Sequence, residues 1–258
     1  MITAGIDFGA KNVKVVILDD EKIVARGSAL TGFDLKIAVK DASEMALKAA
    51  GLKLDEITHI TETGIGQGSV AFAADSVSEV GANAKAGVKL LPSARTIIDV
   101  GAEEARAVKC DESGSMEDFV VNERCAAGAG AFVEAMARAL EVELGQMGPM
   151  SLKATEAVPM NAQCTVFAES EVVSLIHAQT PKANIARAIH DAIAERVISM
   201  VRRLGITEDV LLVGGLAYDV GYVDSMKRGL GVEVHVPELP EYVSAYGAAL
   251  VAQERAKE

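Results

Sequence analysis

Two cysteines, Cys125 and Cys164, stand in sequence contexts that suit chemistry. Cys125 opens the run Cys-Ala-Ala-Gly-Ala-Gly at 125–130, directly before a helical pattern, and Cys164 lies in 161–167, just before another. Two thiols cannot close a four-cysteine metal site, so if these are ligands, a second chain must supply the other two. The alternative from the residues alone is two small buried apolar side chains, as free cysteines commonly are.

A second chemical pattern is an acid followed by a glycine, present twice. The segment Ile-Asp-Phe-Gly-Ala at 6–10 recurs as Ile-Asp-Val-Gly-Ala at 98–102. Each copy is followed by a further apolar segment, a polar turn and a third apolar segment, which predicts a three-stranded β-meander. Two related units at this spacing predict two similarly built domains.

The repeated turn suits phosphate binding. Gly9 and Gly101 let the backbone fold sharply and point amides at an oxyanion. Asp7 and Asp99, at the strand ends, can hold Mg²⁺ beside those phosphates, usually through water. The neighbouring candidates are Ala10, Lys11 and Ala102, with Lys14 as an added cation. The alternative is an ordinary hairpin whose acid caps the turn.

A third glycine turn follows an apolar segment at 210–213. Gly214 and Gly215 there would let a flat nucleoside or a phosphate approach the backbone closely. Further helices are predicted from apolar spacing at 35–50, 128–140, 168–179 and 185–204.

The three turns, in this order, resemble the actin/sugar-kinase/Hsp70 ATPase superfamily. The resemblance implies an α/β, ribonuclease H-like fold with two similar α/β domains around an ATP cleft. The first domain is expected to span 1–92 plus 241–258, and the second to span 93–240 and to contain both cysteines.

Composition narrows the function classes. The 258 residues are 50% hydrophobic and have a formal net charge of −12. An acidic chain argues against binding to nucleic acid or an anionic membrane, both of which favour basic patches. Three cysteines make no disulfide framework, and residues 1–7 lead into a predicted strand without a signal peptide pattern. We expect a reduced, cytoplasmic protein.

Within the superfamily, the segments 125–132 and 164–172 resemble the iron–sulfur ATPases. These are the activators of 2-hydroxyacyl-CoA dehydratases and the ATP-binding subunits of benzoyl-CoA reductase. The resemblance covers essentially the whole chain. It implies a [4Fe–4S] cluster held by Cys125 and Cys164 of each of two subunits, with Mg-ATP as the energy source. It also implies a ferredoxin or flavodoxin donor and an acyl-CoA dehydratase or reductase as the electron acceptor.

The chain departs from the family pattern at the second turn. Residues 101–106 read Gly-Ala-Glu-Glu-Ala-Arg where a typical activator has Gly-Gly-Gln-Asp-Thr-Lys, and Ala10 replaces a hydroxyl residue. Glu103 is therefore a candidate catalytic acid with Asp99, since an acid near a γ-phosphate can orient water. A solvated turn residue is the equal alternative.

Three questions stay open at this point. The dimer could be homotypic, as in activators, or formed with a related subunit, as in benzoyl-CoA reductase. A small-molecule kinase of the same fold is a second function class, although it needs neither cysteine context. A nucleotide-binding actin-like scaffold is a third, and it would be colourless.

Overall fold

The computed structural model describes residues 1–66, 68, 70–122, 130–160 and 164–257. The chain divides into two compact units. The first comprises Met1–Ile97, Val108–Asp118 and Glu241–Glu258, and the second comprises Ile98–Ala107 and Phe119–Pro240. No helix in the described residues is long and apolar enough to cross a membrane.

The first sheet has the strand order β3-β2-β1-β4-β5. Strands β1 and β2 pair antiparallel, β2 and β3 pair antiparallel, and β1 and β4 run parallel. The predicted first β-meander is confirmed. The bounds are β1 (Ile2–Phe8), β2 (Asn12–Asp19), β3 (Lys22–Leu30), β4 (His59–Gly64) and β5 (Asp75–Ser76).

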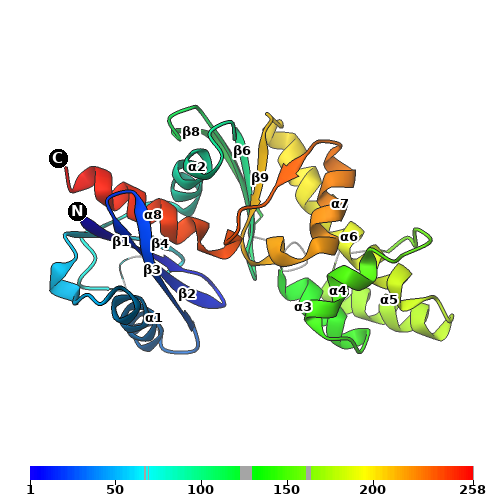
Figure 1. Cartoon of the computed structure of the whole chain (residues 1–258). Helices are drawn as coiled ribbons and strands as arrows, with labels where there is room; N and C mark the ends of the chain where they lie inside the picture. The colour runs from blue at the N-terminus through cyan, green and yellow to red at the C-terminus, as the bar shows by residue number, and fades with distance from the viewer. Residues whose placement is uncertain (67, 69, 123–129, 161–163, 258) are drawn as a thin grey trace. The chain divides into compact units, whose positions relative to one another are not determined.

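Helices pack on both faces of this sheet (Figure 1). On one face, a Cβ at Gly27 would lie 2.0 Å from Ala42 O of α1 (Leu35–Ala50), so the glycine lets this helix approach closely. Gly5 serves α8 (Val243–Arg255) in the same way on the other face, where Ala245 O lies 2.1 Å from its ideal Cβ position. The predicted α1 is confirmed, and it ends at Gly51 in the left-handed region. Helix α2 (Glu79–Leu90) packs against α8, and a short 3₁₀ turn covers Leu54–Glu56.

The second sheet has the order β10-β9-β6-β7-β8. The second predicted meander is confirmed as β6, β7 and β8, and the predicted apolar strand before Gly214 as β9. The bounds are β6 (Thr96–Val100), β7 (Ala105–Cys110), β8 (Met116–Asn122), β9 (Val210–Val213) and β10 (Val234–His235).

The helices of the second unit share one hydrophobic core that includes Phe132, Met136 and Ile189. Helix α6 is longer than predicted by three residues at its start, and α5 also begins three residues before its predicted start. The bounds are α3 (Gly130–Ala139), α4 (Leu144–Ser151), α5 (Thr165–His177), α6 (Lys182–Leu204) and α7 (Val220–Leu230), with 3₁₀ turns at Gly215–Tyr218 and Pro240–Tyr242.

Candidate functional site

The first turn joins β1 to β2 and holds a buried acid beside a lysine. Asp7 is 4% exposed, and Lys14 Nζ donates a hydrogen bond to Asp7 Oδ2 at 2.8 Å. Asp7 Oδ1 is buried without a hydrogen-bond partner in the described part of the chain. Because buried polar atoms are nearly always paired, this oxygen is suited to a group that the chain does not itself supply.

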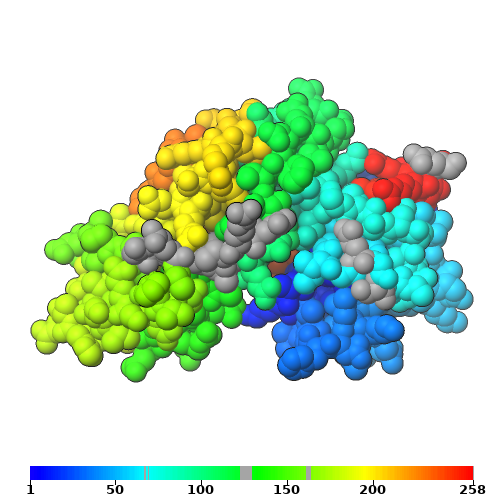
Figure 2. Space-filling view, turned by 180° about the vertical axis from the view of Figure 1, so that it is seen from behind, coloured from blue at the N-terminus to red at the C-terminus, as the bar shows by residue number. Residues whose placement is uncertain are grey.

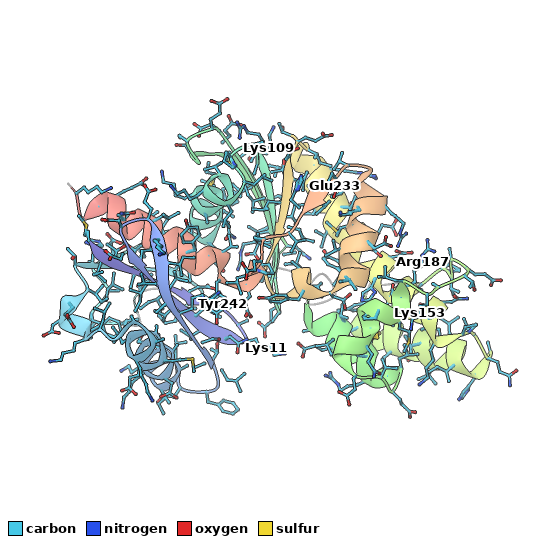
Figure 3. All side chains as sticks on the ribbon, in the orientation of Figure 1. Lys11, Lys109, Lys153, Arg187, Glu233 and Tyr242 are labelled. Atoms are coloured by element: carbon cyan, nitrogen blue, oxygen red, sulfur yellow. The ribbon has the colours of Figure 1, made fainter. Side chains whose placement is uncertain are left out.

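Gly9, Ala10 and Lys11 form the tip of this turn. A side chain at Gly9 would place its Cβ 2.8 Å from both Asn12 O and Lys14 Nζ, so the backbone can pass there only without one. Lys11 is exposed at the tip (Figure 3), and its carbonyl accepts a hydrogen bond from Thr31 N at 3.0 Å. The phosphate-binding roles of these three residues stay predictions.

The second turn, between β6 and β7, contains a partly buried charge network. Asp99 is 6% exposed, and Arg106 Nη1 lies 3.5 Å from Asp99 Oδ2. Arg106 Nη2 forms an ion pair with Glu104 Oε2. One guanidinium therefore balances two carboxylates beside the turn. Glu103, the predicted catalytic acid, is exposed.

The second turn is hydrogen-bonded to the start of α3. Gly130 N donates to Gly101 O and Ala131 N donates to Ala102 O, each at 2.8 Å. A Cβ at Gly130 would lie 3.2 Å from Gly101 O, so glycine eases this close approach. The backbone of the predicted phosphate turn and the first turn of α3 are thus directly linked.

The third glycine turn lies against the second. Gly214 has φ +87°, and a Cβ there would lie 2.4 Å from Val100 O and 2.5 Å from Asp99 Oδ1. The structure therefore brings Gly214 and Asp99 together. At Gly215, by contrast, an added Cβ would have no neighbouring atom within 4 Å.

Of the two predicted ligand cysteines, Cys125 lies outside the described residues. Cys164 is a free cysteine at the N-cap position of α5. Val166 and Phe167, two and three residues after Cys164, are 68% and 73% exposed. Helix α5 forms part of the surface of the second unit (yellow-green in Figure 2) and packs against α3. Cys164 therefore sits at a partly exposed helix start beside apolar surface.

Cys110 differs from Cys164 in its surroundings. It is 2% exposed at the end of β7, and burial raises the pKa of its thiol to about 11. A thiol with such a pKa is protonated at neutral pH and is neither a good nucleophile nor a good ligand. We therefore interpret Cys110 as a structural residue.

The structure adds two residues beside the turns that sequence reasoning missed. Thr63 in β4 is fully buried and lies opposite Asp7 in the strand register. In the sequence, Arg106 stands out only as a departure from the family pattern. For Thr63 the available signal is the polar run Thr-Glu-Thr at 61–63, which is unusual inside a strand whose residues 60–63 are all buried.

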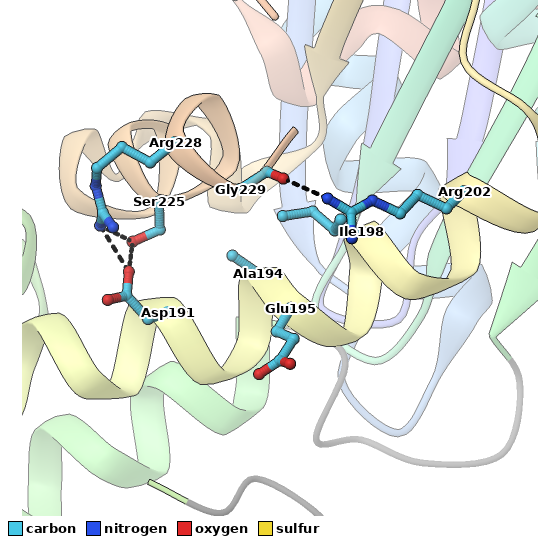
Figure 4. Close-up of a pocket in the computed structure, with 8 residues that line it drawn as sticks. All are labelled: Asp191, Ala194, Glu195, Ile198, Arg202, Ser225, Arg228 and Gly229. Carbon is cyan, nitrogen blue, oxygen red and sulfur yellow. Dashed lines mark hydrogen bonds and ion pairs between the residues drawn. The ribbon is translucent and has the colours of Figure 1, made fainter. Parts of the chain in front are cut away.

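A cavity of about 310 Å³ lies between α6 and α7 of the second unit (Figure 4). Asp191 and Arg228 in its lining form an ion pair, and Arg202 Nη2 donates to Gly229 O at 2.8 Å. Arg228 Nη2 donates to Asp191 Oδ1 at 2.6 Å, and Ser225 Oγ donates to the same oxygen at 2.6 Å. None of the predicted site residues lines it, and its network joins the two helices.

Comparisons with known proteins identify relatives over the full length. The chain is 37% identical over 257 residues to the activator of lactoyl-CoA dehydratase from Anaerotignum propionicum, covering 100% of this chain and 99% of that protein. It is 31% identical over 261 residues to one of the subunits of benzoyl-CoA reductase from Thauera aromatica, with 96% and 92% covered.

Solved structures give the same result. The activator of 2-hydroxyisocaproyl-CoA dehydratase from Clostridium difficile with bound ADPNP superposes with a TM-score of 0.94 at 36% identity, covering 100% of this chain and 96% of that one. A glucokinase of the ROK family from Streptomyces griseus has a TM-score of 0.63 at 12% identity, covering 98% and 100%, and supports the predicted sugar-kinase-like fold alone. The family model for BadF/BadG/BcrA/BcrD ATPases matches residues 4–252. The chain therefore belongs to the BadF/BadG/BcrA/BcrD ATPase family.

Proposed function

We propose that this chain is an ATP-dependent electron-transfer protein that activates a 2-hydroxyacyl-CoA dehydratase. One observation supports it most. The predicted phosphate turn at Gly101 is hydrogen-bonded to the start of α3, and α3 packs against α5, whose N-cap is Cys164. A change at the turn can therefore reach both helices that follow the predicted ligand cysteines.

The nucleotide is Mg-ATP, and each turn contributes to its binding. In the first, Lys14 and the backbone around Gly9, Ala10 and Lys11 contact phosphate, while Asp7 holds a water of the cation. In the second, the backbone of Gly101 and Ala102 contacts phosphate. Asp99, with Arg106 beside it, and Glu103 orient the attacking water, and Gly214 and Gly215 leave room for the nucleoside. The buried, unpaired Asp7 Oδ1 supports this assignment, because a hard cation such as Mg²⁺ prefers oxygen ligands.

Cys125 and Cys164 supply half of the ligands of a [4Fe–4S] cluster. Thiolates at helix starts are stabilised by the free N–H groups and the positive end of the helix dipole. Cys164 occupies such a position, and Cys125 precedes α3 in the sequence. The cluster supplies one-electron chemistry at low potential. Two chains are needed to complete its four ligands.

The acceptor is assigned from the relatives. Identity is higher to the lactoyl-CoA dehydratase activator, 37%, than to the benzoyl-CoA reductase component, 31%. This favours a homodimer that receives one electron from a ferredoxin or flavodoxin and passes it to a dehydratase. ATP hydrolysis to ADP and phosphate drives the transfer by changing the arrangement of the helices that follow the cysteines.

The test is iron content after anaerobic purification. Wild type should be brown, with about four irons per two chains. Cys164→Ser should lose the colour and most of the iron, because it removes a ligand. Cys110→Ser is the matched control and should keep both, since its thiol is buried and protonated. Iron retained in Cys164→Ser, or a colourless wild type after reconstitution, would contradict the proposal.

A further inference from the structure

A row of four polar side chains crosses the first sheet at the carboxyl end of β1. Ser28 of β3 lies opposite Lys14 of β2, Lys14 lies opposite Asp7, and Asp7 lies opposite Thr63 of β4. Residues opposite one another in register point to the same face of a sheet. We call these four residues the polar row.

Most polar atoms of the polar row already have hydrogen-bond partners within the protein. Ser28 hydrogen-bonds the hydroxyl of Tyr242, and burial raises the pKa of that hydroxyl. Tyr242 is labelled in Figure 3. Lys14 Nζ donates to Asp7 Oδ2 at 2.8 Å. In the described residues, two oxygens of the row are buried without any hydrogen-bond partner, Asp7 Oδ1 and Thr63 Oγ1. They belong to adjacent strands.

The arrangement of the row is held by close backbone packing. Gly64 has φ +94°, and a Cβ there would lie 2.6 Å from Phe8 O, so β4 is tightly apposed to β1 just after Thr63. Ile65 N also donates to Phe8 O at 3.1 Å. Thr63 is 0% exposed. Its hydroxyl is therefore fixed next to Asp7 rather than free to turn to solvent.

The first turn of α8 points to the same end of β1. Thr3 Oγ1 donates to Ala249 O at 3.3 Å, and Gly5 lies against Ala245 O. Two residues of a strand cover about the same distance as four residues of a helix, so each step of two residues along β1 corresponds to four residues back along α8. Asp7 therefore lies level with the start of α8, where Tyr242 is the N-cap and makes no side-chain capping bond. A helix start favours anions, so this end of the sheet suits a phosphate with its cation.

We propose that Thr63 is a cation-positioning residue whose hydroxyl, together with Asp7 Oδ1, holds a water of the nucleotide-bound Mg²⁺. The proposal rests on the proposed function, because it assigns a further residue to the same nucleotide site. Buried polar atoms are nearly always hydrogen-bonded, and one bridging water would give both the hydroxyl and the carboxylate oxygen a partner. Mg²⁺ usually retains several waters and contacts few carboxylates directly, which fits this pair of oxygens.

The experiment is calorimetric binding of ADP to the purified protein, with Mg²⁺ and with EDTA. Thr63→Val keeps the shape of the buried side chain and removes its hydroxyl. We expect it to weaken MgADP binding about tenfold and to leave metal-free ADP binding unchanged, and Thr63→Ser should restore MgADP binding. The fold-change corresponds to one hydrogen bond.

Thr61→Val is the matched control. Thr61 is equally buried on the same strand, but its hydroxyl already donates to Asp75 Oδ1 at 2.6 Å. This variant should lose stability and keep the wild-type Mg²⁺ effect. MgADP binding at wild-type strength in Thr63→Val, or equal weakening with and without Mg²⁺, would overturn the role of Thr63. A wild type that binds no ADP under either condition would instead overturn the proposed function.

Discussion

Arg106 forms ion pairs with both acids beside the second turn. Its guanidinium lies between Asp99 and Glu104, and its side chain is only 11% exposed. A buried carboxylate is costly unless it is paired, so this arginine allows two acids to stand beside a predicted phosphate turn. Glu104 and Arg106 carry opposite charges and pair directly.

The adjacent glycines 214 and 215 provide a matched pair of substitutions. Gly214→Ala should lower the free energy of unfolding by about 2–3 kcal/mol, because φ +87° is strained for alanine and its Cβ would lie 2.4 Å from Val100 O. Gly215→Ala should leave stability close to wild type, since an added Cβ there has no neighbour within 4 Å. Urea unfolding of both variants measures the difference. Equal stability of the two would show that the backbone at 214 relaxes without cost.

At the scale of elements, helices α6 and α7 are joined by a partly buried charge network around Asp191. Burial alone would raise the pKa of Asp191, but hydrogen bonds from Arg228 and Ser225 outweigh it and lower that pKa below the ordinary 3.8. A carboxyl whose folded pKa is lowered contributes stability above its unfolded pKa. This contribution is lost as the pH falls through the folded pKa.

Asp191→Asn should therefore destabilise the protein by about 1 kcal/mol at neutral pH, a value discounted for solvent screening. The difference from wild type should shrink below about pH 4. Asp224→Asn is the control, because Asp224 pairs with the same arginine from a more exposed position and should cost less. Urea unfolding at several pH values measures both. A pH-independent difference for Asp191→Asn would point to packing rather than charge.

Most elements of the fold follow from local sequence, and the exceptions have identifiable reasons. The meanders are predictable because apolar segments alternate with polar turns, and α1 ends where Gly51 adopts φ 70°. Helices α2, α4 and α7 are absent from the predicted helices. For α4 the reason is that Gly145, Gly148 and Pro149 lie within it and all disfavour helices in isolation. It forms through tertiary packing, with Met147 fully buried.

The candidate site was predictable only in part. Asp7, Asp99 and the glycines carry a local pattern that indicates a phosphate turn directly. The proposed role of Thr63 depends on the register of β4 against β1, which joins residues far apart in the chain; the buried polar run at 61–63 marks the strand as unusual but does not say that Thr63 lies opposite Asp7. The ion pairs of Arg106 likewise require knowledge of which strand β7 lies beside.

At the scale of the whole molecule, the proposal requires two copies of the chain. Val166 and Phe167, beside Cys164, are strongly exposed for apolar residues. Burying such side chains against a second copy would contribute about 1.5–3 kcal/mol for each large one. If the protein dimerises as proposed, we predict that this surface of α5 lies at the contact between the two copies.

Phe167→Glu should weaken self-association at least tenfold, because it would place a charge in an apolar contact. Phe33→Glu is the control, since Phe33 is even more exposed than Phe167 but belongs to the first unit, in the β3–α1 connection. Sedimentation of the anaerobic protein over a range of concentrations measures the dissociation constant. A dimer unaffected by Phe167→Glu but lost in Phe33→Glu would place the contact on the first unit instead.

The link between the second turn and α3 consists of backbone atoms, from Gly130 N to Gly101 O and from Ala131 N to Ala102 O. Alanine substitution leaves both N–H donors in place, so alanine scanning does not detect these bonds, and proline would remove a donor only by also fixing φ. The link therefore depends on the backbone of the turn and of α3 rather than on the identity of the side chains. Testing it would require chemistry on the main chain, such as an amide-to-ester replacement at residue 130 introduced by semisynthesis.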